Sequence, residues 1–177
     1  MNTNIWMKKF LAILGSALMG AMLATSANAA NPEPVTAQVT FATAITILEN
    51  NPLQIGVLDV AMAVSDTVTI NTDDTFSESA SNIIGGAQAA ADLTITATGS
   101  TGITILADNV LGATYYTLGT WLCRYDGLAD QPCGSAYNVT SAVGGSAVLE
   151  VGVTLTALGS AIAGNDDATF DITVTYQ

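Results

Sequence analysis

Histidine is absent from this sequence of 177 residues, and only three side chains are lysine or arginine. Without histidine the chain cannot build a Ser-His-Asp or Cys-His catalytic site. Two of the three basic residues are lysines close to the N-terminus, in a segment that we expect to be removed. The remaining chain then has no lysine for a covalent intermediate. These absences predict a protein that is not an enzyme.

Metal ligands are also scarce. With no histidine and a single pair of cysteines, the chain lacks four nitrogen or sulfur ligands for a structural zinc site. Aspartate pairs such as Asp73-Asp74 and Asp166-Asp167 supply oxygen ligands, but no loop has the D-x-D-x-D-G spacing of a calcium loop. Carboxylate pairs can also perform acid–base chemistry, yet these lie in turn-like contexts typical of solvated residues. We therefore predict no resident metal and no cofactor, with a weak calcium site as the alternative.

Long apolar runs are missing except at the N-terminus. There, Lys8 and Lys9 precede an apolar run over residues 10–24, and Ala27-Asn28-Ala29 follows as a small-x-small cleavage site. The run is too short for a stable membrane anchor, and no later run reaches about 18 residues. We expect a cleaved signal peptide over residues 1–29, a secreted domain over residues 30–177, and no direct membrane insertion.

Removal of the signal peptide leaves Arg124 as the only basic side chain against fifteen acidic ones. Loss of the two lysines changes the net formal charge from −12 to −14. A charge of this sign makes nucleic acid and anionic lipid poor partners, and it keeps an apolar, β-rich chain soluble.

Cys123 and Cys133 are the only cysteines, and both follow the predicted export signal. In an oxidising compartment their expected fate is a disulfide. Closing a loop of about ten residues stabilises a fold by roughly 2–3 kcal/mol in the chain-entropy model.

The chain does contain many short alternating segments. Thr, Val, Ile and Ala dominate, and Gly, Asn and Asp recur as turn residues between them. This pattern predicts an all-β fold, an antiparallel β-sandwich of about eight or nine strands. Residues 93–98 and 103–106 are expected to form a hairpin about the turn at 99–102. The other expected strands lie within residues 35–47, 53–62, 66–70, 115–122, 148–155 and 169–176.

The first of these segments, residues 35–47, is unusually long. Its odd positions are apolar except at Thr43, and thirteen extended residues would span about 43 Å, well beyond a typical strand. One interpretation is a single strand that bends and passes from one sheet to the other. The alternative is that residues 31–40 leave their own domain and fill a groove in a neighbour. The candidate donor residues are then Val35, Ala37 and Val39.

The last segment alternates strictly. Phe170, Ile172, Val174 and Tyr176 are apolar and alternate with threonine and aspartate, and Gly164 stands in the turn region before them. This pattern predicts a strand with one apolar face. A strand that ends a chain also leaves an edge that another chain can use.

Several pieces of the sequence, in this order, resemble a secreted bacterial family. They are the I-T-I of residues 45–47, the L-Q-I-G of 53–56, the L-T-I-T-A-T-G of 93–99, the V-G-V-T-L of 151–155 and the terminal F-x-I-x-V-x-Y. That family is a domain of unknown function grouped with fimbria-like and spore-coat-U-like surface proteins. The resemblance implies a fimbria-like surface protein.

The C-terminal stretch also resembles the terminal motif of chaperone–usher pilus subunits, with Tyr176 next to last and Gly164 fourteenth from the end. This resemblance implies an immunoglobulin-like or pilin-like fold, a periplasmic chaperone and an outer-membrane usher. In those subunits a groove beside the last strand is filled by strand addition. The cysteines differ, since familiar pilin subunits carry their disulfide near the first strands. An ordinary final core strand would show the same alternation.

Five aromatic residues gather around the cysteines. If exposed together, their rings could stack on a sugar, whereas buried rings would belong to the core, as is common for Tyr and Trp. The exposure of the tryptophan distinguishes the two. The five are Tyr115, Tyr116, Trp121, Tyr125 and Tyr137.

Together these features predict a non-enzymatic structural subunit of a bacterial surface filament, fimbria or coat. We expect it to pass through the periplasm to the cell surface and to assemble with itself or other surface subunits. Assembly would use edge-strand pairing or donor-strand complementation. The alternatives are a glycan-binding adhesin and a free-standing secreted matrix or coat protein.

Overall fold

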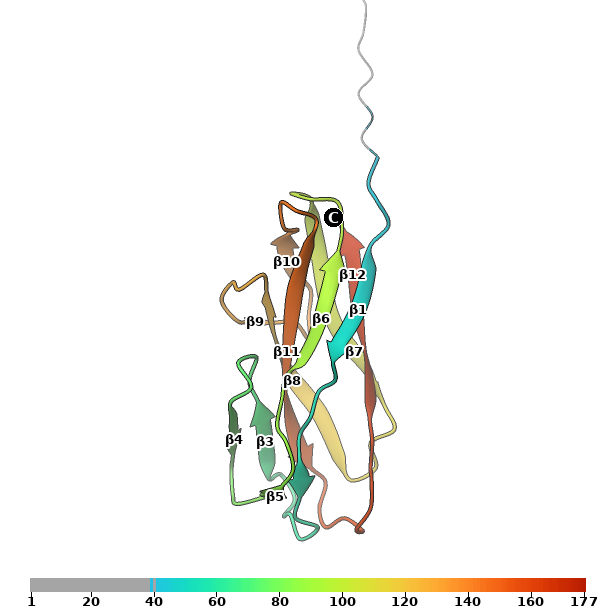
Figure 1. Cartoon of the computed structure of the whole chain (residues 1–177). Helices are drawn as coiled ribbons and strands as arrows, with labels where there is room; N and C mark the ends of the chain where they lie inside the picture. The colour runs from blue at the N-terminus through green and yellow to red at the C-terminus, as the bar shows by residue number, and fades with distance from the viewer. Residues whose placement is uncertain (1–38, 40) are drawn as a thin grey trace, which may run out of the picture. The chain divides into compact units, whose positions relative to one another are not determined.

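The structure, a computed structural model, describes Val39 and residues 41–177, in which the only regular structure is β-strand (Figure 1). Residues Phe41–Gln177 form one compact unit. The all-β prediction is confirmed for these residues, and every strand pair is antiparallel. The strands are β1 (Thr46–Asn51), β2 (Val57–Leu58), β3 (Thr67–Ile70), β4 (Phe76–Glu78), β5 (Ile83–Gly85), β6 (Ala91–Thr96), β7 (Gly102–Leu111), β8 (Tyr116–Tyr125), β9 (Gln131–Pro132), β10 (Tyr137–Thr140), β11 (Ser146–Ala157) and β12 (Thr169–Tyr176).

The larger sheet is built around β11. One edge of β11 pairs first with β6 and then with β3, while its other edge pairs with β8. β1, β4 and β9 add to β6, β3 and β8 respectively. A strand of twelve residues can serve three partners because β6 and β3 share one of its edges end to end.

Gly152 stands where β11 changes partners. Pairing with β6 ends at Val151, and pairing with β3 begins at Val153. A Cβ at Gly152 would lie only 2.5 Å from the carbonyl oxygen of Ile70, at the end of β3. The absent side chain therefore lets the β3–β4 connection approach β11 closely.

The second sheet has the order β10-β7-β12, and its inner face packs against the larger sheet. Alternate residues of β7, including Ile103 and Ile105, are fully buried. They share one apolar core with Ile95, Leu149 and Val151 of the larger sheet. A separate two-stranded piece pairs β2 with β5.

The predicted hairpin at residues 93–106 is wrong. β6 pairs with β1 and β11, whereas β7 pairs with β10 and β12, so residues 97–101 cross between sheets. The crossing is held by Ser141, whose hydroxyl accepts from the Thr101 N–H (2.9 Å) and donates to the Thr98 carbonyl (2.5 Å). A Cβ at Gly99 would lie 2.4 Å from the Val143 carbonyl oxygen, which favours glycine there.

The early strands also differ from prediction. β1 begins only at Thr46 and continues through Asn51, beyond the expected limit at residue 47, while residues 41–45 form no strand. Residues 35–38 and 40 lie outside the described part of the chain. The strand expected at 53–62 is reduced to β2 and a bridge from Gln54, because the backbone of Gly56 turns to a φ of 97°.

Candidate strand-binding groove

One lateral side of the two sheets is open. β1 is the outer strand of the larger sheet and β12 the outer strand of the smaller one, and Figure 1 shows them running in opposite directions. Within the described residues, β1 pairs only with β6 and β12 only with β7. Backbone groups along the free edges are therefore available to a further strand.

A cavity of about 1000 Å³ lies along this side. We call it the β1–β12 groove. Its lining is largely apolar and comes from both sheets. It includes Ile47, Leu53, Met62, Leu155, Phe170 and Ile172. An apolar lining at an unpaired sheet edge is suited to an extended segment whose alternate side chains are apolar.

β12 supplies one wall of the β1–β12 groove. Phe170, Ile172, Val174 and Tyr176 are half-buried against the core, and the residues between them are exposed. Phe170 packs on Trp121 with ring centroids 4.6 Å apart. The predicted alternation is thus present, but its apolar face is only partly covered by the protein's own side chains.

Tyr176 ties the end of β12 to the opposite sheet. Its hydroxyl accepts from the Thr98 N–H (2.7 Å) and donates to the carbonyl oxygen of Thr43 (2.7 Å). The Thr43 N–H in turn donates to the Thr98 hydroxyl (2.7 Å). The hydrogen bonds to Thr98 lower the pKa of the Tyr176 phenol. We call these three residues the Tyr176 clamp. It joins the sheets at the end of the groove where the chain enters β1.

Asp166 orders the loop at the other end of β12. Its carboxylate accepts from the N–H groups of Thr114 (3.0 Å) and Tyr115 (3.0 Å), and these bonds lower its pKa. The Tyr116 hydroxyl donates to the Asp166 carbonyl (2.6 Å), and partial burial raises the pKa of Tyr116. The sequence gives no signal for these contacts, because Asp166 belongs to a pair that resembles a solvated turn.

Gly164 lies in the same loop and lines the groove, with a φ of 148°. A Cβ added there would meet no atom within 4 Å, so space alone does not require glycine. The backbone conformation does favour it. The predicted assembly residues Gly164, Phe170 and Ile172 thus lie along the groove, and Val174 and Tyr176 lie beyond the lined part.

On the opposite lateral side the two sheets are bridged. Cys123 and Cys133 form the expected disulfide, with their Cα atoms 5.7 Å apart. The Cys133 N–H donates to the Trp121 carbonyl in the larger sheet (3.1 Å), and the Cys133 carbonyl accepts from Ala107 in the smaller one (2.8 Å). A single residue therefore bridges the sheets on this side.

The aromatic residues around the disulfide do not form an exposed platform. Trp121, Tyr125 and Tyr137 are buried in the core. Tyr115 and Tyr116 are half-buried and line the β1–β12 groove. The burial of Trp121 favours a role in the core over stacking on a sugar.

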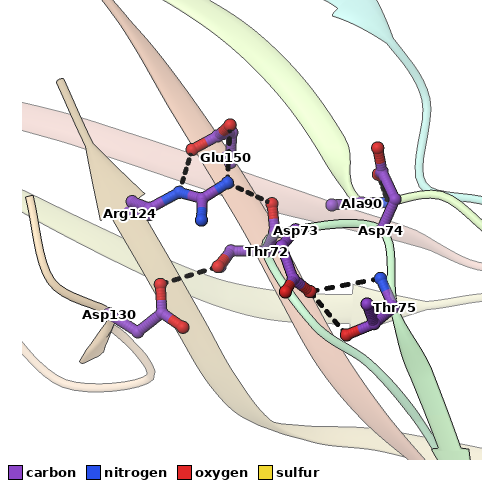
Figure 2. A network of polar contacts seen from close by, with 8 residues as sticks. All are labelled: Thr72, Asp73, Asp74, Thr75, Ala90, Arg124, Asp130 and Glu150. Atoms are coloured by element: carbon purple, nitrogen blue, oxygen red, sulfur yellow. Dashed lines mark hydrogen bonds and ion pairs between the residues drawn. The ribbon is translucent and has the colours of Figure 1, made fainter. Parts of the chain in front are cut away.

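Some of the charged side chains outside the groove form a structural network (Figure 2). Arg124 of β8 is paired with Glu150 of β11 and also donates to the Thr72 carbonyl (2.9 Å). The Thr72 hydroxyl donates to Asp130 (2.6 Å), while Asp73 accepts from the Thr75 hydroxyl (2.5 Å), which lowers the Asp73 pKa. This network holds the β3–β4 turn on the sheet.

Two kinds of feature are absent from the described residues, namely a cluster of metal-ligating side chains and a membrane-spanning helix. Among them, no three His, Cys, Asp or Glu side chains gather in a way that could hold a metal ion. The part of the chain that the structure covers contains no helix long and apolar enough to cross a membrane.

The candidate donor residues are placed only in part. Val35 and Ala37 lie outside the described residues, and Val39 is exposed. Phe41, the next apolar position of the same alternation, is 88% exposed.

Neither protein-family models nor curated proteins match this sequence. The groove and its surroundings are therefore the basis for a functional assignment.

Proposed function

We propose that this protein is a non-enzymatic structural subunit of a bacterial surface filament, fimbria or coat. In this proposal its sheets form an immunoglobulin-like or pilin-like β-sandwich that lacks one edge strand. Another molecule supplies that strand to the β1–β12 groove. The observation that carries the proposal is the apolar groove between β1 and β12, each of which pairs along one edge only within the described residues.

The physical gain from an added strand has two parts. The outer edge of β12 offers backbone groups along eight residues, and an added strand pairs with them. Its inward side chains also cover Phe170 and Ile172, which the domain itself leaves half-buried. Burial of apolar surface contributes about 25 cal/mol per Å², so covering this face stabilises the complex and the subunit together.

The partners and location follow from the same proposal. An open apolar edge is an aggregation hazard during export, so a periplasmic chaperone is a suitable first occupant. An outer-membrane usher and other surface subunits would follow, which places the mature protein at the cell surface. The single arginine, Arg124, is occupied by Glu150, so the described surface offers no basic patch for nucleic acid.

The test supplies the missing strand in the same chain. Seven residues of alternating valine and threonine are fused after Gln177 through a glycine-rich linker, and the control carries the same residues with the valines grouped together. We expect only the alternating fusion to raise the midpoint of thermal unfolding and to protect β12 amides from hydrogen exchange. Equal stability of the two fusions and the unfused chain would show that the groove takes no strand.

A further inference from the structure

We propose that the strand received by the β1–β12 groove belongs to a different protein and carries a lysine or arginine on its inward face, and that Glu49 of β1 selects it. This inference rests on the proposed function and names the chemistry of the partner. Two observations carry it, namely the position of Glu49 and the scarcity of basic side chains in this chain.

Glu49 lies on the inner face of an outer strand. In the pairing of β1 with β6, Glu49 is directly opposite Leu93. Directly opposed residues of an antiparallel pair have their side chains on the same face of the sheet. Leu93 is buried in the core, so Glu49 faces the same side, and both residues line the groove. Ile47, two residues earlier on β1, lines it too, so a carboxylate stands where the alternation would place an apolar side chain.

The Glu49 carboxylate makes no hydrogen bond or ion pair among the described residues. Most of the other acidic side chains that line the groove do have partners there. Asp59, Asp166 and Asp171 each accept hydrogen bonds from neighbouring N–H groups. Glu49 is exposed, so water solvates its charge as long as the groove is open.

A strand that fills the groove covers this carboxylate. Removing a carboxylate from water is unfavourable unless another group compensates its charge. A lysine or arginine at the facing position of the added strand replaces the lost hydration with an ion pair. Glu49 therefore disfavours strands whose inward side chains are all apolar, and it favours a strand that includes a cation.

A second copy of this chain has no free basic side chain to offer. After removal of the predicted signal peptide, Arg124 is the only one. Arg124 is paired with Glu150 and donates to the Thr72 carbonyl, as Figure 2 shows. It also belongs to β8, which is paired with β11 and would have to leave its sheet to act as a donor. The cation therefore comes from another protein, and the acidic charge of this chain attracts a basic partner.

The first experiment places a cation in the fused strand. The alternating valine–threonine strand after Gln177 is made in four versions, each with lysine in place of one of its four valines. The controls carry glutamine at the same positions. We expect one position at which lysine raises the midpoint of thermal unfolding above that of glutamine by about 2–4 °C, and added salt should reduce this difference.

Two acidic variants of the domain identify the residue responsible. Glu49→Gln removes the charge and keeps the size of the side chain. Asp108→Asn is the matched control, because Asp108 is exposed, makes no hydrogen bond among the described residues and does not line the groove. We expect the advantage of lysine to disappear in Glu49→Gln and to persist in Asp108→Asn. The all-valine strand should also stabilise Glu49→Gln more than it stabilises the unmodified domain, because no charge is then covered.

The second experiment uses the mature chain without any fusion. Hydrogen exchange of the β12 amides is measured at low and at high protein concentration. Because no copy supplies the cation, we expect the exchange rates to be the same at both concentrations.

The outcomes separate this inference from the proposed function. Equal midpoints for lysine and glutamine at all four positions overturn the inference, and so does a lysine advantage that survives Glu49→Gln. Protection of β12 that grows with protein concentration also overturns it, because a second copy then fills the groove. In these cases the proposed function stands if the all-valine fusion stabilises the domain. If no fused strand changes the midpoint, both are wrong.

Discussion

Replacement of Gly152 by alanine tests the point where β11 changes partners. A Cβ at this position would lie 2.5 Å from the Ile70 carbonyl oxygen, 3.0 Å from the Asn71 carbonyl carbon and 3.1 Å from the Thr72 nitrogen. All three atoms belong to the backbone, so no side chain can rotate away. The added methyl group must therefore displace the start of the β3–β4 turn or the β11 strand.

The size of the effect follows from two opposing contributions. Inserting a methyl group into a well-packed site costs about 1–3 kcal/mol. Removing a glycine restricts the unfolded chain and offsets this by about 0.4–1 kcal/mol. We expect Gly152→Ala to lower the free energy of unfolding by about 1–2 kcal/mol and to loosen the contact between Arg124 and the Thr72 carbonyl.

Gly119→Ala is the matched control, because Gly119 lies in β8, the neighbour of β11, and a Cβ there would meet no atom within 4 Å. This variant should be as stable as the unmodified chain or more stable by about 0.5 kcal/mol. Urea unfolding followed by Trp121 fluorescence measures both. If the two variants unfold within about 0.5 kcal/mol of each other, close approach at Gly152 does not shape this sheet.

Three further predictions concern the two lateral sides and the loop before β12. Tyr176→Phe removes the hydroxyl of the Tyr176 clamp, so it should lower the free energy of unfolding and speed hydrogen exchange in the segment that enters β1. Tyr137→Phe is the control, because the Tyr137 hydroxyl makes no hydrogen bond among the described residues. This variant should change neither quantity. Replacement of both Cys123 and Cys133 by alanine should lower the free energy of unfolding by roughly 2–3 kcal/mol, measured against the oxidised protein, and equal stability would contradict the loop-closure argument. Hydrogen bonds lower the pKa of Asp166 below its ordinary value of 3.8. The ionised carboxylate therefore contributes its full stability above pH 3.8, and this contribution is lost as the pH falls through the lowered pKa. Between about pH 5 and about pH 3, Asp166→Asn should accordingly lose less stability than the unmodified chain.

Alternation predicted individual strands well. The expected segments at residues 66–70, 93–98 and 169–176 correspond to β3, β6 and β12, with their limits shifted by no more than two residues. The reason is local, because a strand with one buried face must repeat every two residues. The short strands β4, β5 and β9 carry too few residues to show such a period.

Which sheet each strand joins could not be predicted in the same way. A four-residue Gly-Ser-Thr-Gly connection fits a hairpin as well as a crossing between sheets. The crossing is decided by Ser141, which lies 40 residues beyond Thr101 and binds both ends of the connection. Alternation within β12 likewise predicted that this strand has an apolar face. It could not predict that Ile47 and Leu53, which are distant in the sequence, line the other side of the groove.

The two lateral sides of the protein explain how an incomplete edge can persist in a stable domain. On one side, Cys133 bonds to both sheets and its disulfide fixes the bridge covalently. On the other side, the Tyr176 clamp joins the sheets at one end only, and the rest of that side is the β1–β12 groove. Because the bridge holds the sheets together independently of the groove, a bound strand need not be present for the core to form. The disulfide therefore lies where it can stabilise the domain without obstructing the edge that we propose receives a further strand.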